Sequence, residues 1–140
     1  MNGVAKKFAG IVLLFGLAGC NGVQVIPTVY DGESGIYHYD NQVRTGMTKS
    51  QLIDTLGEPR SKHLAVSDQQ VRHQFETLFG NTGYLDLPDD DEYDYFYYEA
   101  SATEHRTNLA QNITITHYKQ CIYAFNSNDA LIAFNCRTSD

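Results

Sequence analysis

The clearest pattern of apolar and polar positions lies in residues 45–59 and predicts a short helix with both ends marked. Thr48 is placed to cap this helix, and Gln51 can reach back to the Thr48 backbone N–H in the reciprocal arrangement called a capping box. An apolar stripe and a stop follow, formed by Leu52, Ile53, Leu56, Gly57 and Pro59. Such a stripe packs one helix face on a core, and a left-handed glycine commonly ends a helix. The segment therefore predicts where a fold begins, and nothing about an activity.

A second helix is predicted over residues 67–79, with Ser67 as its cap and Gln70 at the third position. Its apolar positions recur at helical spacing and are Val71, Phe75, Leu78 and Phe79. Gly80 ends the run. Residues 73–78 also alternate between polar and apolar, so a strand remains the alternative for that part.

From residue 93 the period changes to two, which predicts an aromatic strand over residues 93–98. A structural interpretation places one face of this strand in the core. A functional interpretation makes its tyrosines a possible partner surface, formed by Tyr93, Tyr95, Tyr97 and Tyr98. Aromatic platforms for nucleic-acid bases also need basic residues. None is interleaved here, so no nucleic acid is expected.

Residues 112–126 and 130–137 predict a hairpin. If residues 128–129 are the centre of its turn, Cys121 lies opposite Cys136. The same register pairs Tyr123 with Phe134 and Phe125 with Ile132. A three-residue loop would put the cysteines on opposite faces, because side chains alternate along a strand. In an oxidising compartment we expect a Cys121–Cys136 disulfide, worth about 3 kcal/mol in the chain-entropy model.

Residues 1–19 predict a secretory signal, with Lys6 and Lys7 before an apolar run at residues 8–18. That run is too short to span a bilayer core, which takes about 20 apolar residues. Residues 17–20, LAGC, resemble the lipobox of bacterial lipoproteins, in which the cysteine is acylated and becomes the new N-terminus. An ordinary secretory signal with a chance cysteine at position 20 is the alternative.

The lipobox resemblance implies lipid attachment at Cys20, with a diacylglyceryl group and an N-acyl chain such as palmitate. Several chains anchor firmly, because each buried CH2 adds about 0.8 kcal/mol. Asn21 follows, whereas in enteric lipoproteins an aspartate at that position marks inner-membrane retention. The expected location is therefore the periplasmic face of the outer membrane.

Residues 20–44 show no sustained period and contain Pro27 and several glycines. We expect this segment to be a tether that lifts the domain off the membrane. The alternative is a short strand that pairs with a partner's sheet edge. Its apolar positions would be Val23, Val25, Ile26, Val29 and Tyr30.

Without its first 19 residues the chain has 8 basic and 17 acidic residues, a net charge of −9. This balance argues against nucleic-acid binding, which needs a basic face. The acidic run at residues 89–92 lacks the spacing of a calcium loop, so a solvated loop is expected. The histidines are scattered, and the expected disulfide uses the cysteine nearest His117. We therefore expect no catalytic site, no metal and no cofactor.

The segment GMTKSQLIDTLGEP, after a lipobox and before an aromatic strand and a hairpin, resembles the SmpA/OmlA (BamE-like) family of outer-membrane lipoproteins. The matching positions are Gly46, Met47, Thr48, Leu56, Gly57 and Pro59. The resemblance implies an α+β fold, two short N-terminal helices packed on a three-stranded antiparallel sheet, as in β-lactamase inhibitory protein. The chain departs from the pattern in three ways. The connection at residues 60–92 is longer than in the family pattern, and the disulfide hairpin is not part of that pattern. Asp129 stands where the family usually has glycine.

The expected organisation is a signal peptide at residues 1–19, an anchored tether at 20–44 and a domain at 45–140. By the resemblance, the function is that of a non-enzymatic accessory subunit that binds a protein partner in outer-membrane β-barrel assembly. The alternative is a periplasmic inhibitor or ligand-sensing lipoprotein built on the same helix–sheet module. A structural envelope lipoprotein without a dedicated partner is a third possibility.

Overall fold

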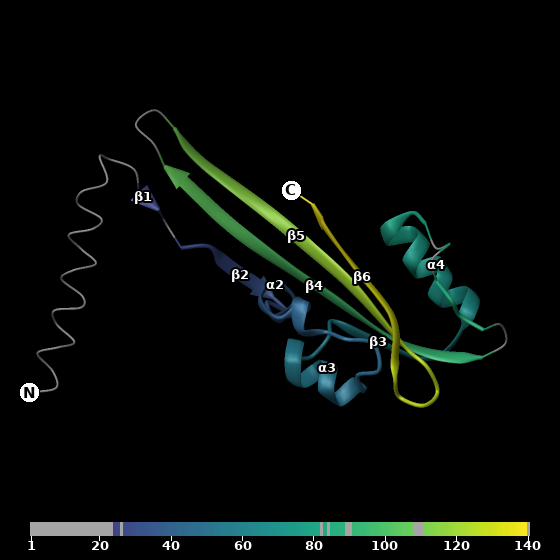
Figure 1. Ribbon diagram of the computed structural model, residues 1–140. Coiled ribbons are helices and arrows are strands. Elements are labelled where there is room, and N and C mark those ends of the chain that lie inside the picture. The colour runs from purple at the N-terminus through teal and green to yellow at the C-terminus, as the bar shows by residue number, and fades with distance from the viewer. Residues whose placement is uncertain are drawn as a thin grey trace, which may run out of the picture. The chain divides into compact units, whose positions relative to one another are not determined.

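The computed structural model describes residues 24–25, 27–81, 83, 85–88, 91–107 and 111–139 (Figure 1). The chain divides into two compact units. One consists of Met1–Val29 with Thr103–Ile115, and the other of Tyr30–Ala102 with Thr116–Asp140. In chain order the elements are β1 (Gln24–Val25), β2 (Val29–Gly32), α2 (Gly35–His38), the 3-10 helix η1 (Asp40–Gln42), α3 (Lys49–Leu56), β3 (Ser61–Ser67), α4 (Asp68–Phe79), β4 (Glu92–Thr107), β5 (Asn112–Phe125) and β6 (Leu131–Ser139).

The strand β4 organises a mostly antiparallel sheet. It pairs with β1, β2, β3 and β5, and β6 pairs with β5. In the first unit, Gln24 and Val25 of β1 pair with Thr107 and Arg106. In the second unit, β3 runs antiparallel along the start of β4 from Ser61–Tyr97 to Ser67–Glu92. The α+β class expected from the sequence is therefore confirmed.

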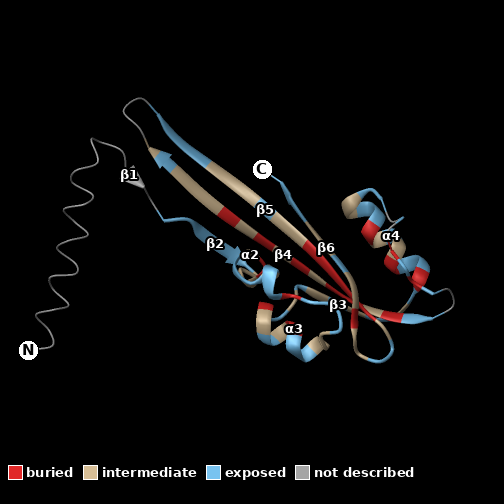
Figure 2. Cartoon of the chain, in the orientation of Figure 1, coloured by how far each residue is buried: buried red, intermediate tan, exposed pale blue. Residues whose placement is uncertain are grey.

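One face of the sheet in the second unit packs on α2 and α3. The even-numbered residues of β4 and the odd-numbered residues of β5 point to this face, because side chains alternate along a strand. The buried residues of this first core are Ile36, Val43, Leu52, Leu56, Phe96, Tyr98, Ala100, Cys121, Tyr123, Phe125 and Leu131. Figure 2 shows how burial in β4 and β5 concentrates where the strands run alongside the helices.

The opposite face packs on α4 and the segment 85–88, and only near the start of β4. Its second core contains Val71, Phe75, Leu85, Leu87, Tyr93, Tyr95, Ile122 and Ala124. Arg72 of α4 holds the segment in place, because its guanidinium donates to the carbonyl oxygens of Leu85 at 3.3 Å and Leu87 at 2.7 Å. The sheet is therefore covered on both faces at one end.

Both predicted helices form, and both predicted capping boxes are confirmed. Thr48 accepts a hydrogen bond from the Gln51 N–H while Gln51 accepts one from Thr48 N–H, and Ser67 and Gln70 repeat the arrangement. Residues 73–78 are helical, not a strand. Gly80 ends α4 in the left-handed conformation, whereas Gly57 ends α3 with φ 93° and an extended ψ of −178°.

The layout of two N-terminal helices on a three-stranded sheet is not confirmed. The three predicted strands are β4, β5 and β6, but β3 separates the two predicted helices and pairs with β4. Strand β3 could not be predicted because its residues, SKHLAVS, do not alternate cleanly between apolar and polar. Its burial is correspondingly intermittent. The longer connection at residues 60–92 thus adds a strand to the sheet and places α4 on the second face.

The prediction of a tether is wrong for residues 29–44. This segment forms β2, α2 and η1, and Ile36 and Val43 are buried in the first core. Two apolar residues spaced by seven positions gave no periodic signal, yet burying each stabilises the fold by about 1.5–3 kcal/mol. The alternative, pairing of an apolar strand with a sheet edge, describes β2 correctly except that the edge belongs to its own chain.

The hairpin of β5 and β6 has the predicted cysteine register. Cys121 pairs with Cys136, their sulfurs are 2.06 Å apart, and Tyr123 pairs with Phe134. The predicted pair of Phe125 with Ile132 is wrong, because Phe125 pairs with Leu131. The register shifts between Ala124 and Phe125, so Ile132 is an extra residue in β6 and packs in the second core. The turn itself is the three-residue loop, since the Asn126 N–H donates to the Ala130 carbonyl at 3.0 Å. The bulge lets this loop coexist with the disulfide register, contrary to the expectation from strict alternation along the strands.

Candidate functional site

Among the described residues, no helix covers the second face of the sheet beyond the second core, and we call this region the open face. Its residues come from four segments and are Asp31, Arg60, Tyr97, Glu99, Ser101, Tyr118 and Gln120. Tyr97, Glu99 and Ser101 are alternate residues of β4, so they point to the same side. Tyr118 of β5 is 49% exposed, the most exposed tyrosine of the described residues.

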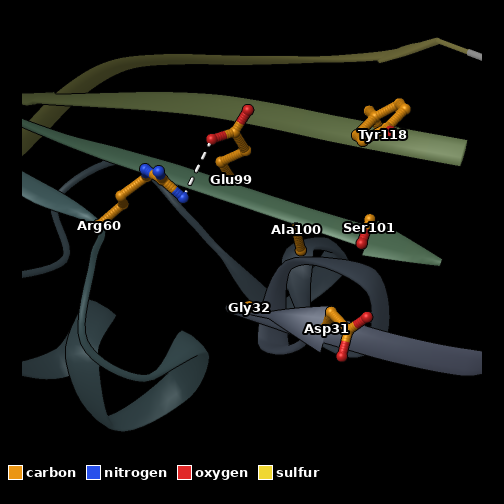
Figure 3. A pocket seen from close by; sticks show the side chains of 7 residues that line it. All are labelled: Asp31, Gly32, Arg60, Glu99, Ala100, Ser101 and Tyr118. Atoms are coloured by element: carbon orange, nitrogen blue, oxygen red, sulfur yellow. Dashed lines mark ion pairs between the residues drawn. The ribbon is translucent and has the colours of Figure 1, made fainter.

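A shallow hollow of about 270 Å³ lies on this open face (Figure 3). It is lined by Asp31, Gly32, Arg60, Glu99, Ala100, Ser101 and Tyr118. Figure 3 shows Arg60 extended toward Glu99, with Tyr118 on the neighbouring strand and Asp31 on β2. The hollow is therefore bounded by charged and hydroxyl groups on a floor of β-sheet backbone.

One ion pair crosses the hollow. The Arg60 guanidinium lies 3.2 Å from a Glu99 carboxylate oxygen, and both side chains are partly exposed to solvent. The Arg60 backbone is fixed, since its N–H donates to the Tyr97 carbonyl at 2.8 Å. A pair this exposed contributes little to stability, about 0–1 kcal/mol. Arg60 and Glu99 can therefore separate, and each can pair with an opposite charge of a partner, at a small cost in free energy.

The wall of the hollow at β2 depends on Gly32. A Cβ at this position would lie 2.8 Å from the Glu99 carbonyl oxygen, and the residue has φ +71°. Both facts require glycine, because other residues rarely adopt this conformation and have no room here. The close approach continues at Glu33, whose N–H donates to the Glu99 carbonyl at 3.4 Å. Gly32 thus brings Asp31 beside the β4 residues of the open face.

A chain of hydrogen bonds extends the open face toward α4. Gln120 Nε2 donates to the Tyr97 hydroxyl at 2.8 Å, and Arg137 Nε donates to Gln120 Oε1 at 2.9 Å. Arg137 also donates to the Leu78 carbonyl at 3.2 Å. Burial raises the pKa of Tyr97, although the hydrogen bond from Gln120 opposes the shift. The phenol is therefore neutral at physiological pH and serves as a hydrogen-bonding group.

The open face is suited to binding, because it presents charged, hydroxyl and aromatic groups together. Of its two carboxylates, that of Glu99 is paired with Arg60. Among the described residues, no three His, Cys, Asp or Glu side chains are grouped so that they could hold a metal ion. None of the described helices has the length and apolar character that a membrane crossing needs.

The predicted partner surface on the aromatic strand is largely core. Tyr98 is 0% exposed and packs in the first core, while Tyr93 and Tyr95 are buried in the second. Both faces of the sheet are covered near the start of β4, and side chains alternate along a strand, so its tyrosines enter two different cores. Only Tyr97 reaches the open face. The residues that sequence reasoning missed are Asp31, Arg60, Glu99 and Tyr118. Only Glu99 had a signal, which is the alternation of polar and apolar residues in β4 after Tyr97.

The other predicted site residues separate into two groups. Cys121 and Cys136 form the disulfide, which leaves no thiol at Cys121 for a site with His117. Cys20, the predicted lipid attachment residue, lies outside the described residues, as do the signal at residues 1–19 and the carboxylates of Asp89 and Asp90.

No protein-family model matches the chain, and no curated protein or solved structure matches it either.

Proposed function

We propose that the chain is a non-enzymatic lipoprotein, anchored through Cys20 on the periplasmic face of the outer membrane, which binds a protein partner through the open face. The open face carries this proposal. It combines an exposed tyrosine, an exchangeable Arg–Glu pair and the carboxylate of Asp31 on the surface of a sheet. Tyrosine and arginine are among the side chains that most often dominate binding energy at protein interfaces.

The sequence suggests which partner this is. The resemblance of residues 46–59 to SmpA/OmlA lipoproteins favours a subunit of the outer-membrane β-barrel assembly machinery. The net charge of −9 without the signal favours a partner with a basic docking surface. Asp31 and Glu99 would then receive its lysines or arginines, while Tyr118 supplies apolar contact area.

The test is photo-crosslinking from the full chain in its native envelope. A photoreactive residue at position 118 should capture a protein partner, whereas one at Gln69, exposed on α4, should not. With the photoreactive residue moved to a second open-face position, the substitution Tyr118→Ala should reduce capture of the partner about tenfold, because the interface loses one anchor. Leu64→Ala, which truncates a side chain that is 61% exposed elsewhere, is the matched control.

The captured proteins decide between outcomes. Barrel-assembly subunits at position 118 would support the whole proposal. Other captured proteins would leave the docking surface standing and refute the assignment to barrel assembly. No captured protein at any open-face position would refute the docking surface.

A second candidate function is inhibition of an enzyme or sensing of a ligand in the periplasm. It is favoured by another hollow of about 270 Å³, lined partly by Asp86, Asp91 and Glu92 beside the turn residues Asn126 and Asn128. This site would suit a cationic group. A deletion strain separates the two functions, because only defective barrel assembly should increase sensitivity to large antibiotics.

A further inference from the structure

A second exposed surface carries aromatic rings instead of charges. The ring of Tyr30 lies 5.3 Å from that of Tyr37 and 4.6 Å from that of His38, and His38 is 5.9 Å from Tyr39. Tyr30 is 38% exposed and Tyr39 is 47% exposed. We call Tyr30, Tyr37, His38 and Tyr39 the aromatic patch. It lies on β2, α2 and the residue after α2.

The aromatic patch and the open face are on opposite sides of β2. Tyr30 and Asp31 are neighbours in the strand, so their side chains point to opposite faces. Asp31 lines the hollow of the open face, whereas Tyr30 contacts the rings of α2. One surface can therefore be occupied while the other stays free.

The charge beside the patch is compensated, although the chain as a whole is strongly acidic. The carboxylate next to it, Asp40, is paired with Lys119, whose side chain is only 13% exposed. The Lys119 ammonium also lies 5.6 Å from the centre of the Tyr37 ring. Tyr37 donates its hydroxyl proton to the His117 carbonyl at 3.0 Å, and burial raises the pKa of this phenol. The patch thus offers aromatic rings and phenol hydroxyl groups.

Chain length places this patch within reach of the proposed anchor. Tyr30 is ten residues from Cys20, and a fully extended chain covers at most about 3.3–3.6 Å per residue. The patch therefore cannot be farther than about 36 Å, along the chain, from an acylated Cys20. Tyrosine rings concentrate at the headgroup level of membranes, because one end of the ring is apolar and the other forms hydrogen bonds.

We propose that the aromatic patch rests on the headgroup region of the bilayer that holds the Cys20 acyl chains. This proposal rests on the lipid anchor of the proposed function. The occupant is a zwitterionic lipid surface, since a chain with net charge −9 is repelled by an anionic one. Contact of the patch with the bilayer leaves the open face, on the other side of β2, turned toward protein partners.

The absence of tryptophan from the whole chain makes a clean test possible. Tyr39→Trp introduces a single indole in the patch, and Tyr118→Trp introduces one on the open face as the matched control. Each full-length variant is purified from membranes and reconstituted in phosphatidylcholine vesicles with and without brominated acyl chains. Bromines should quench the indole at position 39 by about half, because ring side chains of this kind sit at the interface. The indole at position 118 should keep its fluorescence.

The outcomes separate this proposal from the one on which it depends. A chain that does not float with vesicles lacks the anchor, which overturns both. A chain that floats but shows no quenching at position 39, or equal quenching at both positions, overturns the membrane contact and leaves the anchor intact. A photoreactive residue at position 39 that captures a protein instead of lipid would assign the patch to a protein partner and also overturn the contact.

Discussion

Two of the described non-glycine residues have a positive φ, Ala65 at 53° and Asp129 at 57°. Both are held by polar contacts around one lysine. The Ala65 N–H donates to Asp94 Oδ1 at 2.8 Å, and Lys49 Nζ lies 2.6 Å from the other oxygen of Asp94. The Lys49 N–H donates to Asp129 Oδ1 at 3.1 Å. Burial lowers the pKa of Lys49, but Asp94 and Asp129 more than compensate and raise it.

Ala65→Gly should increase the free energy of unfolding by up to about 1 kcal/mol. An L-residue in this region costs about 1–2 kcal/mol, and the extra freedom of glycine in the unfolded chain offsets part of the gain. Denaturant unfolding measures the change. The matched control is Ala133→Gly in β6, where φ is not positive, and a loss of about 0.5–1 kcal/mol is expected. Equal losses at both positions would show that Ala65 is not strained.

At the scale of elements, the hairpin of β5 and β6 combines a turn, a bulge and a disulfide. Asn126 holds the turn, because its side-chain oxygen accepts the N–H groups of Asn128 and Ala130. The bulge at Ile132 then restores the register in which Cys121 meets Cys136. The bulge also turns Ile132 toward the second core, where Ala133 packs as well.

Replacing both Cys121 and Cys136 by alanine should lower the free energy of unfolding by about 3 kcal/mol, because the disulfide closes a loop of 15 residues. Unfolding of the oxidised chain in denaturant, followed by circular dichroism, gives the reference value. The unsubstituted chain in a reductant should lose a similar amount, and the alanine variant should not respond to the reductant. A variant as stable as the oxidised chain would show that packing alone holds the hairpin.

For the whole molecule, the distinctive feature is that both cores bury tyrosines. These are Tyr98 and Tyr123 in the first core and Tyr93 and Tyr95 in the second. Burial raises the pKa of Tyr98 and Tyr123 far above the ordinary value, and it also raises the pKa of Tyr95 and Tyr97. Tyr98 is fixed as well as buried, since its hydroxyl donates to the Gly57 carbonyl at 2.8 Å. The fold therefore depends on these phenols remaining protonated.

The contribution of the buried tyrosines to the free energy of unfolding should be fully present below about pH 10 and should fall as the pH rises further. Tyrosines of the unfolded chain ionise near pH 10, whereas the buried ones hold their protons, so alkali favours unfolding. Thermal unfolding between pH 8 and 12, with phenolate absorbance recorded in parallel, measures the effect. Tyr98→Phe should show a shallower loss between pH 10 and 12. An equally steep loss in that variant would show that other groups control alkaline unfolding.

Much of the local structure could be predicted because its causes lie within a few residues. The capping boxes at Thr48 and Ser67, the glycines after both helices and the period-two strands depend on neighbouring side chains and backbone groups. The cysteine register was predictable too, although the turn that produces it differs. By contrast, β3 has no clear periodicity, and nothing in Arg60 or Asp31 alone shows that the chain brings them beside Glu99.

The sequence by itself determined the helices, the aromatic strand, the disulfide pair and the expectation of an anchor at Cys20. Only the tertiary structure decided that residues 29–44 join the fold, that Tyr93, Tyr95 and Tyr98 are core, and that the open face and the aromatic patch are exposed. The physical reason is that hydrogen bonds of caps and strand alternation are local, whereas burial depends on which distant segments cover a face. Local pattern shows that a side chain is apolar, and the packing of the whole chain decides whether it is buried.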